Sequence, residues 1–384
     1  MAARTYKLTK LKTALGIFIA VLFFSMSLNA QHETTEEKES IESEEFNASK
    51  MIMHHVSDAH EIHFVGDDKD GSSIAIYLPV ILKTNDGWDV FSSSNFYHNL
   101  VSHKDDHGEA HDYYAYNGYI LFHENIYYAN EHGGITLEHG HAVNEKPFDL
   151  SITKNVAGVF FAIFLLFLFL RATVKGYKKN EGHAPKGLQA ILEPLILFIR
   201  DDVVLPSFNN DKVRAEKFMP FLLSTFFFIW IANMIGLIPF LGGFNVTGTI
   251  SITLVLAAIV FILTMINGNK GYWMHIVWPP GVPAFVKPIL VPIELASIFI
   301  KPTVLMVRLT ANIMAGHIII LAFVSLILIF GAQSAAVGYG VGVGSTIFMV
   351  FMYFIELLVA FLQAYVFTLL TSIYLGDATQ TAKH

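Results

Sequence analysis

Several ionisable and polar side chains stand inside apolar sequence. In "VLMVRLTANIMAGHIII", residues 304–320, the apolar run is interrupted by Arg308, Asn312 and His317. A lipid-facing guanidinium at this place would cost at least about 2.5 to 3.5 kcal/mol on insertion scales. A second apolar run near the C-terminus carries Glu356 and Gln363. Because an imidazole and a carboxylate can exchange a proton near neutral pH, while arginine stays charged, these residue types favour a functional site over a purely structural one.

Helical geometry collects many of these residues on one face. At about 100° per residue, four polar side chains fall within about 40° of Arg308, namely Glu294, Ser297, Lys301 and Asn312. On the other run, Glu356 and Gln363 are seven positions apart and so lie within about 20° of one face. His317 falls about 180° from Arg308 and therefore belongs to a different face.

An antiparallel pairing of the two runs would fix the depth of each polar residue. Residue numbers at one depth then have a near-constant sum, which places His317 level with Glu356 and Arg308 level with Gln363. A structural alternative is that His317 and Glu356 are a buried pair that only satisfies the charge and hydrogen-bonding groups of each other. That alternative is weaker for Arg308, because Glu294, the nearest acidic residue in sequence, is roughly 21 Å away along the helix axis. The counter-charge of Arg308 is expected on another chain.

Composition identifies the medium in which these residues lie. The chain has 384 residues, of which 53% are hydrophobic and only 15% charged, and its mean hydropathy is +0.50. These values are typical of an integral membrane protein. The absence of cysteine excludes disulfides, thiolate zinc sites and cysteine nucleophiles.

Apolar runs of spanning length predict about five membrane-embedded helices. They cover about 155–172, 218–240, 249–267, 288–330 and 338–376. A straight helix of 38 residues is roughly 57 Å long, nearly twice the hydrocarbon thickness, so the last two must tilt strongly or break. Pro288, Pro292 and Pro302 are candidate kinks. The glycine-rich "GAQSAAVGYGVGVGS" predicts the turn of an antiparallel hairpin.

Positive charge predicts the orientation of these helices. Residues 171–217 are rich in Lys and Arg, whereas 241–248 and 331–345 contain neither. By the positive-inside rule, 171–217 is cytoplasmic, the first span runs from outside to inside, and the C-terminus is cytoplasmic. Within this loop, residues 188–206 fit a helix on the cytoplasmic membrane surface, and a simple loop helix is the alternative.

The chain before the first span has a different character. Residues 1–30 have the layout of a signal peptide with cleavage near Ala30, an uncleaved anchor being the alternative. Residues 31–150 hold 23 acidic residues and 13 of the 17 histidines. The part from 60 to 145 alternates like short strands, and "YYAY", "NG", "YILF" predicts a hairpin. We therefore predict an acidic, His-rich periplasmic extension with a small strand-rich domain.

One segment of this extension raises the question of metal binding. His103, His107 and His111 recur at intervals of four, with carboxylates between them. Imidazole and carboxylate groups can bind a divalent cation. A solvated acidic loop is the favoured interpretation, because the segment contains glycine and has no apolar face to form the helix that would align the three histidines.

The two apolar runs that carry these polar residues also resemble a known protein family. The segment "ELASIFIKPTVLMVRLTANIMAGH", followed by "YFIELLVAFLQAYVFTLLTSIYL", closely resembles subunit a of the F-type ATP synthase. The resemblance covers roughly 150–384, with "FFFIWIANMIGLIP" in the second span, and leaves residues 1–150 outside the family core. Many members carry a carboxylate at the position of His317 and an imidazole at that of Glu356, so this chain shows the pair exchanged.

The resemblance implies a fold and a set of partners. The implied fold is an all-α polytopic membrane domain, residues 151–384, whose last two helices form a long tilted hairpin, preceded here by the strand-rich extension. Its partners would be a ring of c subunits, the b subunits of the peripheral stalk, the complete synthase and membrane lipid, with no nucleic acid and no cofactor. Such a subunit of a bacterial plasma membrane is not itself an enzyme. The ATP chemistry belongs to other subunits, and no glycine-rich phosphate loop is found here.

The resemblance also implies a role for each polar residue. Arg308 would face the ring, attract each ring carboxylate after it loses its proton, and stop protons from leaking between two offset half-channels. The implied outer half-channel is lined by Asn233, Asn312, His317, Glu356 and Gln363. The implied inner half-channel uses Glu294 and Ser297. Whether H⁺ or Na⁺ is the coupling ion stays open, because the ring site chiefly selects it.

Two other classes of protein compete with this interpretation. A secondary transporter or divalent-metal carrier would explain the outer histidines, but inverted repeats and paired broken helices are not found in the sequence. A purely structural scaffold would not explain why Arg308, Glu294 and Glu356 stand inside apolar runs. Copurification of the native protein with ATPase activity would separate the three. Since every residue of the implied path follows residue 150, we expect the path to lie wholly within the later helices.

Overall fold

The fold comes from a computed structural model. It describes residues 48–65, 74–85, 87–97, 99–104, 110–130, 132–138, 141–238, 243–279 and 281–380. The predicted signal peptide lies outside these residues, as does His107.

Five helices in this part of the chain are long and apolar enough to cross a membrane. They are α4 (Lys154–Lys179), α7 (Lys212–Gly236), α8 (Ile250–Asn267), α10 (Lys287–Gln333) and α11 (Ala335–Thr379). The prediction of about five membrane-embedded helices is thus confirmed. The chain is a multi-pass membrane protein.

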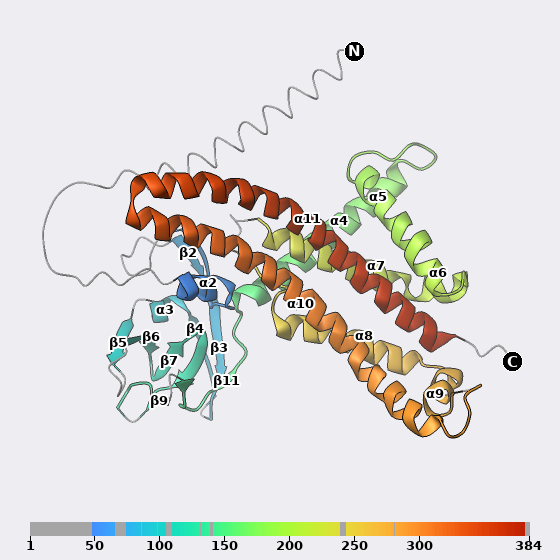
Figure 1. The fold of residues 1–384 in the computed structure, drawn as a ribbon, viewed down its shortest axis with the longest axis horizontal. Coiled ribbons are helices and arrows are strands. Elements are labelled where there is room, and N and C mark those ends of the chain that lie inside the picture. The colour runs from blue at the N-terminus through green and yellow to red at the C-terminus, as the bar shows by residue number, and fades with distance from the viewer. Residues whose placement is uncertain are drawn as a thin grey trace, which may run out of the picture. The chain divides into compact units, whose positions relative to one another are not determined.

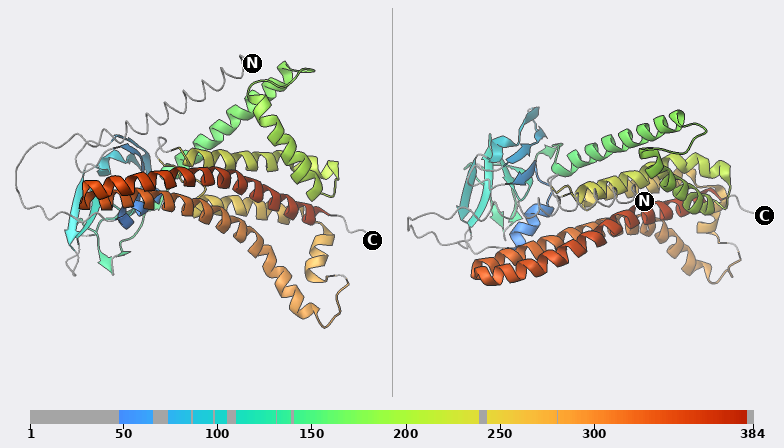
Figure 2. Two further views of the ribbon diagram at one scale, coloured as in Figure 1. Left: turned by 45° about the horizontal axis from the view of Figure 1, so that its top comes forward. Right: turned by 90° about the horizontal axis from the view of Figure 1, so that it is seen from above.

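The last two helices form the predicted antiparallel hairpin (Figure 1). α10 has 47 residues and α11 has 45, and neither is broken. Pro292 and Pro302 lie inside α10 without ending it. Figure 2 shows α10 bending away from α11 toward the short helix α9 (Lys270–Val277). Prolines remove backbone hydrogen bonds and so permit this bend.

The turn of the hairpin lies inside the predicted glycine-rich segment but is much shorter than that segment. Only Ser334 is extended between the two helices, with φ −164° and ψ 135°. The glycines that follow are helical and serve close packing: a Cβ added to Gly338 would lie 2.6 Å from Cα of Gly331. Small residues let helix backbones approach in this way within membranes. The glycines therefore bring α10 and α11 together instead of forming a long loop.

Side-chain contacts fix the register of the hairpin. Phe323 and Phe348 stack with ring centroids 4.5 Å apart. Farther from the turn, Gly316 packs against the Glu356 side chain, and Nζ of Lys301 lies 5.4 Å from the centre of the Tyr374 ring. These contacts agree with the predicted near-constant sum of residue numbers.

The connection between α4 and α7 contains the predicted helical segment. It forms α5 (Leu188–Phe198), a π-helical stretch (Ile199–Val204) and α6 (Leu205–Ser207). Several of its apolar residues, including Leu192 and Val203, are buried in the core of the membrane domain. The segment therefore packs on its own bundle. A location on the membrane surface stays a prediction.

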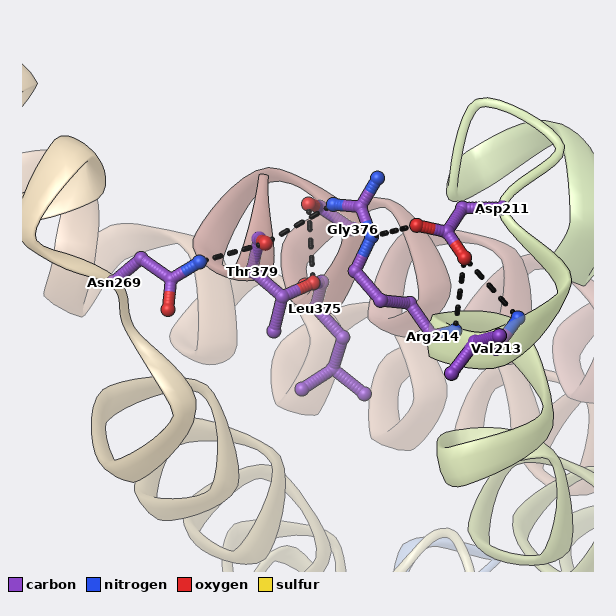
Figure 3. Close-up of polar contacts among 7 residues, drawn as sticks. All are labelled: Asp211, Val213, Arg214, Asn269, Leu375, Gly376 and Thr379. Carbon is purple, nitrogen blue, oxygen red and sulfur yellow. Dashed lines mark hydrogen bonds and ion pairs between the residues drawn. The ribbon is translucent and has the colours of Figure 1, made fainter. Parts of the chain in front are cut away.

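A polar cluster joins three helices at the C-terminal end of α11 (Figure 3). Asp211 caps α7 by accepting from the N–H groups of Val213 and Arg214. The Arg214 guanidinium donates to Asp211 at 2.7 Å and to the Thr379 carbonyl at 3.0 Å. The Asn269 side chain donates to the same carbonyl at 2.8 Å. The cluster satisfies a carbonyl that the end of α11 leaves without a helical partner.

We expect Arg214→Ala to destabilise the protein by about 1.5 kcal/mol, the lower end for a hydrogen bond to a charged group, because the arginine is partly exposed. Thermal unfolding in detergent measures the loss. Arg200→Ala is the matched control, since Arg200 is exposed and pairs only with its neighbour Asp201 among the described residues. Equal effects of the two substitutions would show that the cluster adds no stability.

The extension contains small antiparallel sheets, as predicted. One has the order β5 (Leu100–Lys104), β6 (Ala110–Tyr116), β7 (Tyr119–Phe122) and β8 (Asn125–Tyr128). Another has the order β11 (Phe148–Asp149), β3 (Pro79–Lys83) and β4 (Trp88–Ser92), and β1 (Glu61–Val65) pairs with β2 (Ile74–Tyr77). The remaining pieces are β9 (Leu137–Glu138), β10 (His141–Ala142), α2 (Ala48–Val56) and α3 (Ser94–Tyr97).

The predicted Asn-Gly hairpin is confirmed. Tyr116 pairs with Tyr119 across the turn. Asn117 and Gly118 both have positive φ, 50° and 78°, as a type I′ turn requires. Since successive side chains of a strand face opposite sides, β7 buries Tyr119 and Leu121 in one aromatic cluster and Ile120 and Phe122 in another.

Candidate functional site

Arg308 lies on an outward face of α10. It is exposed, whereas the neighbouring Leu305 and Leu309 are buried in the helix bundle. Asn312, one turn later, is exposed on the same side. Among the residues that the structure describes, Arg308 has no hydrogen-bond or ion-pair partner. An uncompensated guanidinium on a membrane helix calls for an anion from another molecule.

A cavity of about 320 Å³ lies near the turn end of the hairpin. It is lined by His317 from α10 and Glu356 from α11, and also by parts of α4, α7 and the extension. Its ionisable and amide lining groups are Glu61, His63, Lys154, Asn245, His317, Tyr353 and Glu356. A cavity of this size with several polar partners can hold water.

His317 and Glu356 face this cavity without a direct hydrogen bond or ion pair between them. Glu356 is 8% exposed, and its Oε2 has no hydrogen-bond partner in the described part of the chain. Nε2 of His317 would lie 3.5 Å from a Cβ added to Gly236 of α7. Because both side chains line one cavity with room for water, a bridging water is the route by which a proton would pass between them.

Gly316 is what allows Glu356 into this position. A Cβ at Gly316 would overlap Oε1 of Glu356 and lie 2.9 Å from the carboxyl carbon. Any larger residue would force the carboxyl group to move. A glycine inside a helix costs roughly 1 kcal/mol relative to alanine, so its presence here serves packing against the carboxylate.

The other two predicted outer residues lie deeper in the bundle. Asn233 is 3% exposed, donates to the Ala360 carbonyl at 3.1 Å and accepts from the Thr247 hydroxyl. Its amide therefore ties α7 to α11, and it is absent from the cavity lining. Gln363 is buried on α11. The register of the hairpin places it at a depth similar to that of Arg308.

The predicted inner residues, Glu294 and Ser297, lie near the other end of α10, and neither lines the small pocket found there. The Ser297 hydroxyl donates to the Glu294 carbonyl at 2.7 Å. A pocket of about 20 Å³ lies close by and is lined by Tyr272, Lys301, Tyr374 and Asp377, among others. That volume fits about one water molecule. Burial, and then the nearby carboxylates of Asp377 and Glu294, raise the pKa of the Tyr272 phenol.

Three residues that line the two pockets were not predicted from the sequence: Asp377 in the small pocket, and Glu61 and His63 in the larger cavity. Asp377 could have been found, because the same antiparallel register places it level with Glu294. Glu61 and His63 could not, since they reach the cavity only through the packing of the extension on the membrane helices. The expectation that the path lies wholly within the later helices stays a prediction, but the wall of the cavity that His317 and Glu356 line also includes Glu61 and His63.

The two ends of the histidine segment of the extension lie in strands. His103 in β5 and His111 in β6 are register partners, and His107 lies outside the described residues. Within the part of the chain that the structure describes, no group of three or more His, Cys, Asp or Glu side chains could hold a metal ion.

Comparison with known families assigns the two parts of the chain separately. The family model described as ATP synthase A chain matches residues 156–376. A second model, described as a domain of unknown function, matches residues 51–150.

Comparison with individual proteins gives relatives over the membrane part. The chain is 42% identical over 240 residues to ATP synthase subunit a 2 of Chlorobaculum tepidum, covering 60% of this chain and 64% of that protein. It is 38% identical over 243 residues to ATP synthase subunit a of Chloroherpeton thalassium, covering 62% and 69% respectively. The corresponding protein of Anaeromyxobacter sp. is 33% identical over 273 residues, which cover 67% of this chain and 63% of that protein.

Proposed function

Because the chain belongs to the ATP synthase A chain family, we propose that it is the ion-translocating stator subunit of an F-type ATP synthase. In this role it couples proton flow to rotation of a ring of c subunits. The relatives are named as ATP synthase subunit a, which supports the assignment. The subunit is not catalytic, and the ATP chemistry belongs to other subunits.

The observation that carries this proposal is the exposed Arg308 on α10. Its guanidinium is charged at every accessible pH, and no anion among the described residues neutralises it. A ring carboxylate that has just lost its proton is the partner that fits. The fixed positive charge favours the ionised ring site and opposes the passage of a free proton along the same surface.

Two separate polar groups support two offset half-channels. His317 and Glu356 line the outer cavity near the turn of the hairpin. Glu294 and Ser297 lie toward the other end of α10, beside the pocket that Asp377 and Lys301 line. Arg308 stands between the two groups in the chain. A proton would then cross only by travelling with the ring from one group to the other.

The distribution of charge supports an orientation in a bacterial plasma membrane. The Lys and Arg residues at the end of α4 and the start of α7 support a cytoplasmic location for the connection between these two helices. The C-terminus is assigned to the same side and the extension to the periplasm. The b subunits of the peripheral stalk and the ring are the expected neighbours. Proton or sodium coupling is then decided by the ring.

ATP synthesis in reconstituted vesicles tests the function and identifies the ion. The whole complex that contains this chain is placed under a H⁺ gradient or a Na⁺ gradient separately. Synthesis under one of the two gradients is the expected result, and the gradient that drives it identifies the coupling ion. Failure of the native chain to copurify with ATPase activity would refute the assignment to the synthase.

Substitution at Gly316 tests the position of Glu356. We expect Gly316→Ala to lower proton flux about tenfold or more, because the added Cβ occupies the place of the carboxylate and a small misplacement of a reacting group is costly. Passive flux through vesicles that contain the complex without its ATPase head measures this. Gly340→Ala is the matched control, since a Cβ there meets nothing within 4 Å. Normal flux in Gly316→Ala would contradict the role of Glu356.

A further inference from the structure

The extension is fixed to the membrane domain at the start of α4. The Asp58 carboxylate accepts hydrogen bonds from the Thr153 hydroxyl at 2.8 Å and from the Asn155 N–H at 2.9 Å. The Ala59 carbonyl accepts from the Lys154 N–H at 2.8 Å. Asp58 thereby caps a helix that begins almost a hundred residues later, with its negative charge at the positive end of the helix dipole.

Contacts farther inside the membrane domain reinforce this attachment of the extension to α4. The Asn155 amide donates to the Thr249 hydroxyl at 2.7 Å, and its oxygen accepts from the Asn245 N–H at 2.9 Å. Ile62 of the extension is buried in the apolar core of the membrane domain. The segment that follows Asp58 is therefore held in place by both polar and apolar contacts.

Glu61 and His63 of this segment line the cavity that contains His317 and Glu356. Nδ1 of His63 lies 3.7 Å from Oε1 of Glu61. Their exposures differ: 27% of the His63 side chain is exposed, against 1% of the Glu61 side chain. The imidazole thus stands nearer to the outer solution, and the carboxylate lies deeper in the cavity wall.

We propose that the extension completes the outer half-channel, with Glu61 and His63 as proton carriers between the outer solution and the pair His317 and Glu356. The inference rests on the proposed function. In each step a proton leaves one group, moves along a hydrogen bond or a bridging water, and binds the next group. The Lys154 ammonium in the wall repels cations, and the Glu61 carboxylate offsets that repulsion.

The first test replaces both acid–base groups with amides in the full complex. Glu61→Gln combined with His63→Gln should lower proton flux through complexes without the ATPase head about tenfold, the low end of the effect of charge focusing in a cleft. The matched control is Glu138→Gln with His141→Gln, an exposed Glu and His that pair across β9 and β10 outside the cavity. Unchanged flux in the first double variant would overturn the proposal.

A reference variant separates this inference from the proposed function. Glu356→Gln, measured in the same vesicles, should lower flux whether or not the extension takes part. If Glu356→Gln lowers flux and the Glu61 and His63 variant does not, the inference fails and the proposed function stands. If neither lowers flux, the proposed function fails as well.

A second variant guards against loss of folding. The chain has no cysteine, so His63→Cys introduces its single thiol, and the wild-type complex treated with the same reagent reveals any effect on thiols of the other subunits. A bulky, membrane-impermeant thiol reagent added from the outer side should block flux in His63→Cys, and leave it unchanged in His141→Cys. Complete modification of His63→Cys without a change in flux would show that the proton path does not pass this residue.

Discussion

Arg308→Ala is expected to abolish ATP synthesis driven by an ion gradient while leaving the complex assembled. The side chain is exposed on α10, and its neighbours Leu305 and Leu309 supply the packing of that turn. Its removal therefore costs little stability. What is lost is the fixed charge that holds an ionised ring carboxylate and bars direct proton leakage. Synthesis rates in reconstituted vesicles and subunit composition of the purified complex are the two measurements.

Arg308→Lys should also fail to support most of the synthesis. An ammonium group is compact and readily deprotonated when desolvated, unlike the delocalised guanidinium. Arg171→Ala is a suitable control, because Arg171 is likewise an exposed arginine on a membrane helix. Wild-type rates in Arg308→Ala would refute the role of the residue. Near-normal coupling in Arg308→Lys would show that local positive charge alone is sufficient.

His317 and Glu356 should behave as one unit in proton transfer. Glu356→Gln and His317→Gln are each expected to slow flux about 100-fold, the lower end of what a positioned proton-transfer group contributes. Both side chains line the same cavity, so the double variant should be little worse than the poorer single variant. A strongly non-additive cycle is the signature of two groups in series.

The reciprocal exchange His317→Glu with Glu356→His provides the control for this pair. It restores the arrangement that many members of the resembling family carry, and part of the lost flux should return. Flux through complexes without the ATPase head is again the measurement. Strictly additive losses, with no recovery in the exchanged variant, would show that the two residues act independently.

The membrane helices could be predicted because lipid imposes a simple rule on them. A long apolar run must be helical to satisfy its backbone, so the five spans followed directly from composition. The register of α10 and α11 followed from antiparallel pairing, and the contacts of Phe323 with Phe348 and of Gly316 with Glu356 agree with it.

The turn of the hairpin shows where local propensity fails. Glycine is a weak helix former, and the run after Phe330 therefore predicts a loop. In the structure Gly331 and Gly338 instead meet across the two helices. Close backbone contact between the helices outweighs the low helix propensity of glycine here. The local sequence does not reveal whether a glycine forms a turn or permits close packing of two helices.

The site was predicted in part for the same reasons. Arg308, His317 and Glu356 are conspicuous because charge is costly in lipid. Asn233 was also singled out, but its amide is used by Ala360 and Thr247. Glu61 and His63 lie in an extension where acidic residues and histidines are common, so their residue types alone do not mark them as functional. The bonds that Asp58 makes to α4, together with the contacts of Ala59 and Ile62, bring them to the cavity.

The polar cluster around Thr379 has a mechanical consequence under the proposed function. A rotor that turns against the α10 and α11 hairpin exerts a sideways force along its length. At one end the two helices are joined by the single residue Ser334; at the other, Arg214 and Asn269 bind the last turn of α11 to its neighbours. Ser334 holds the two helices to each other, whereas Arg214 and Asn269 hold α11 to the rest of the bundle. Under a sideways load we expect the anchored end of α11 to be displaced less than the turn, as in a beam that is clamped at one end.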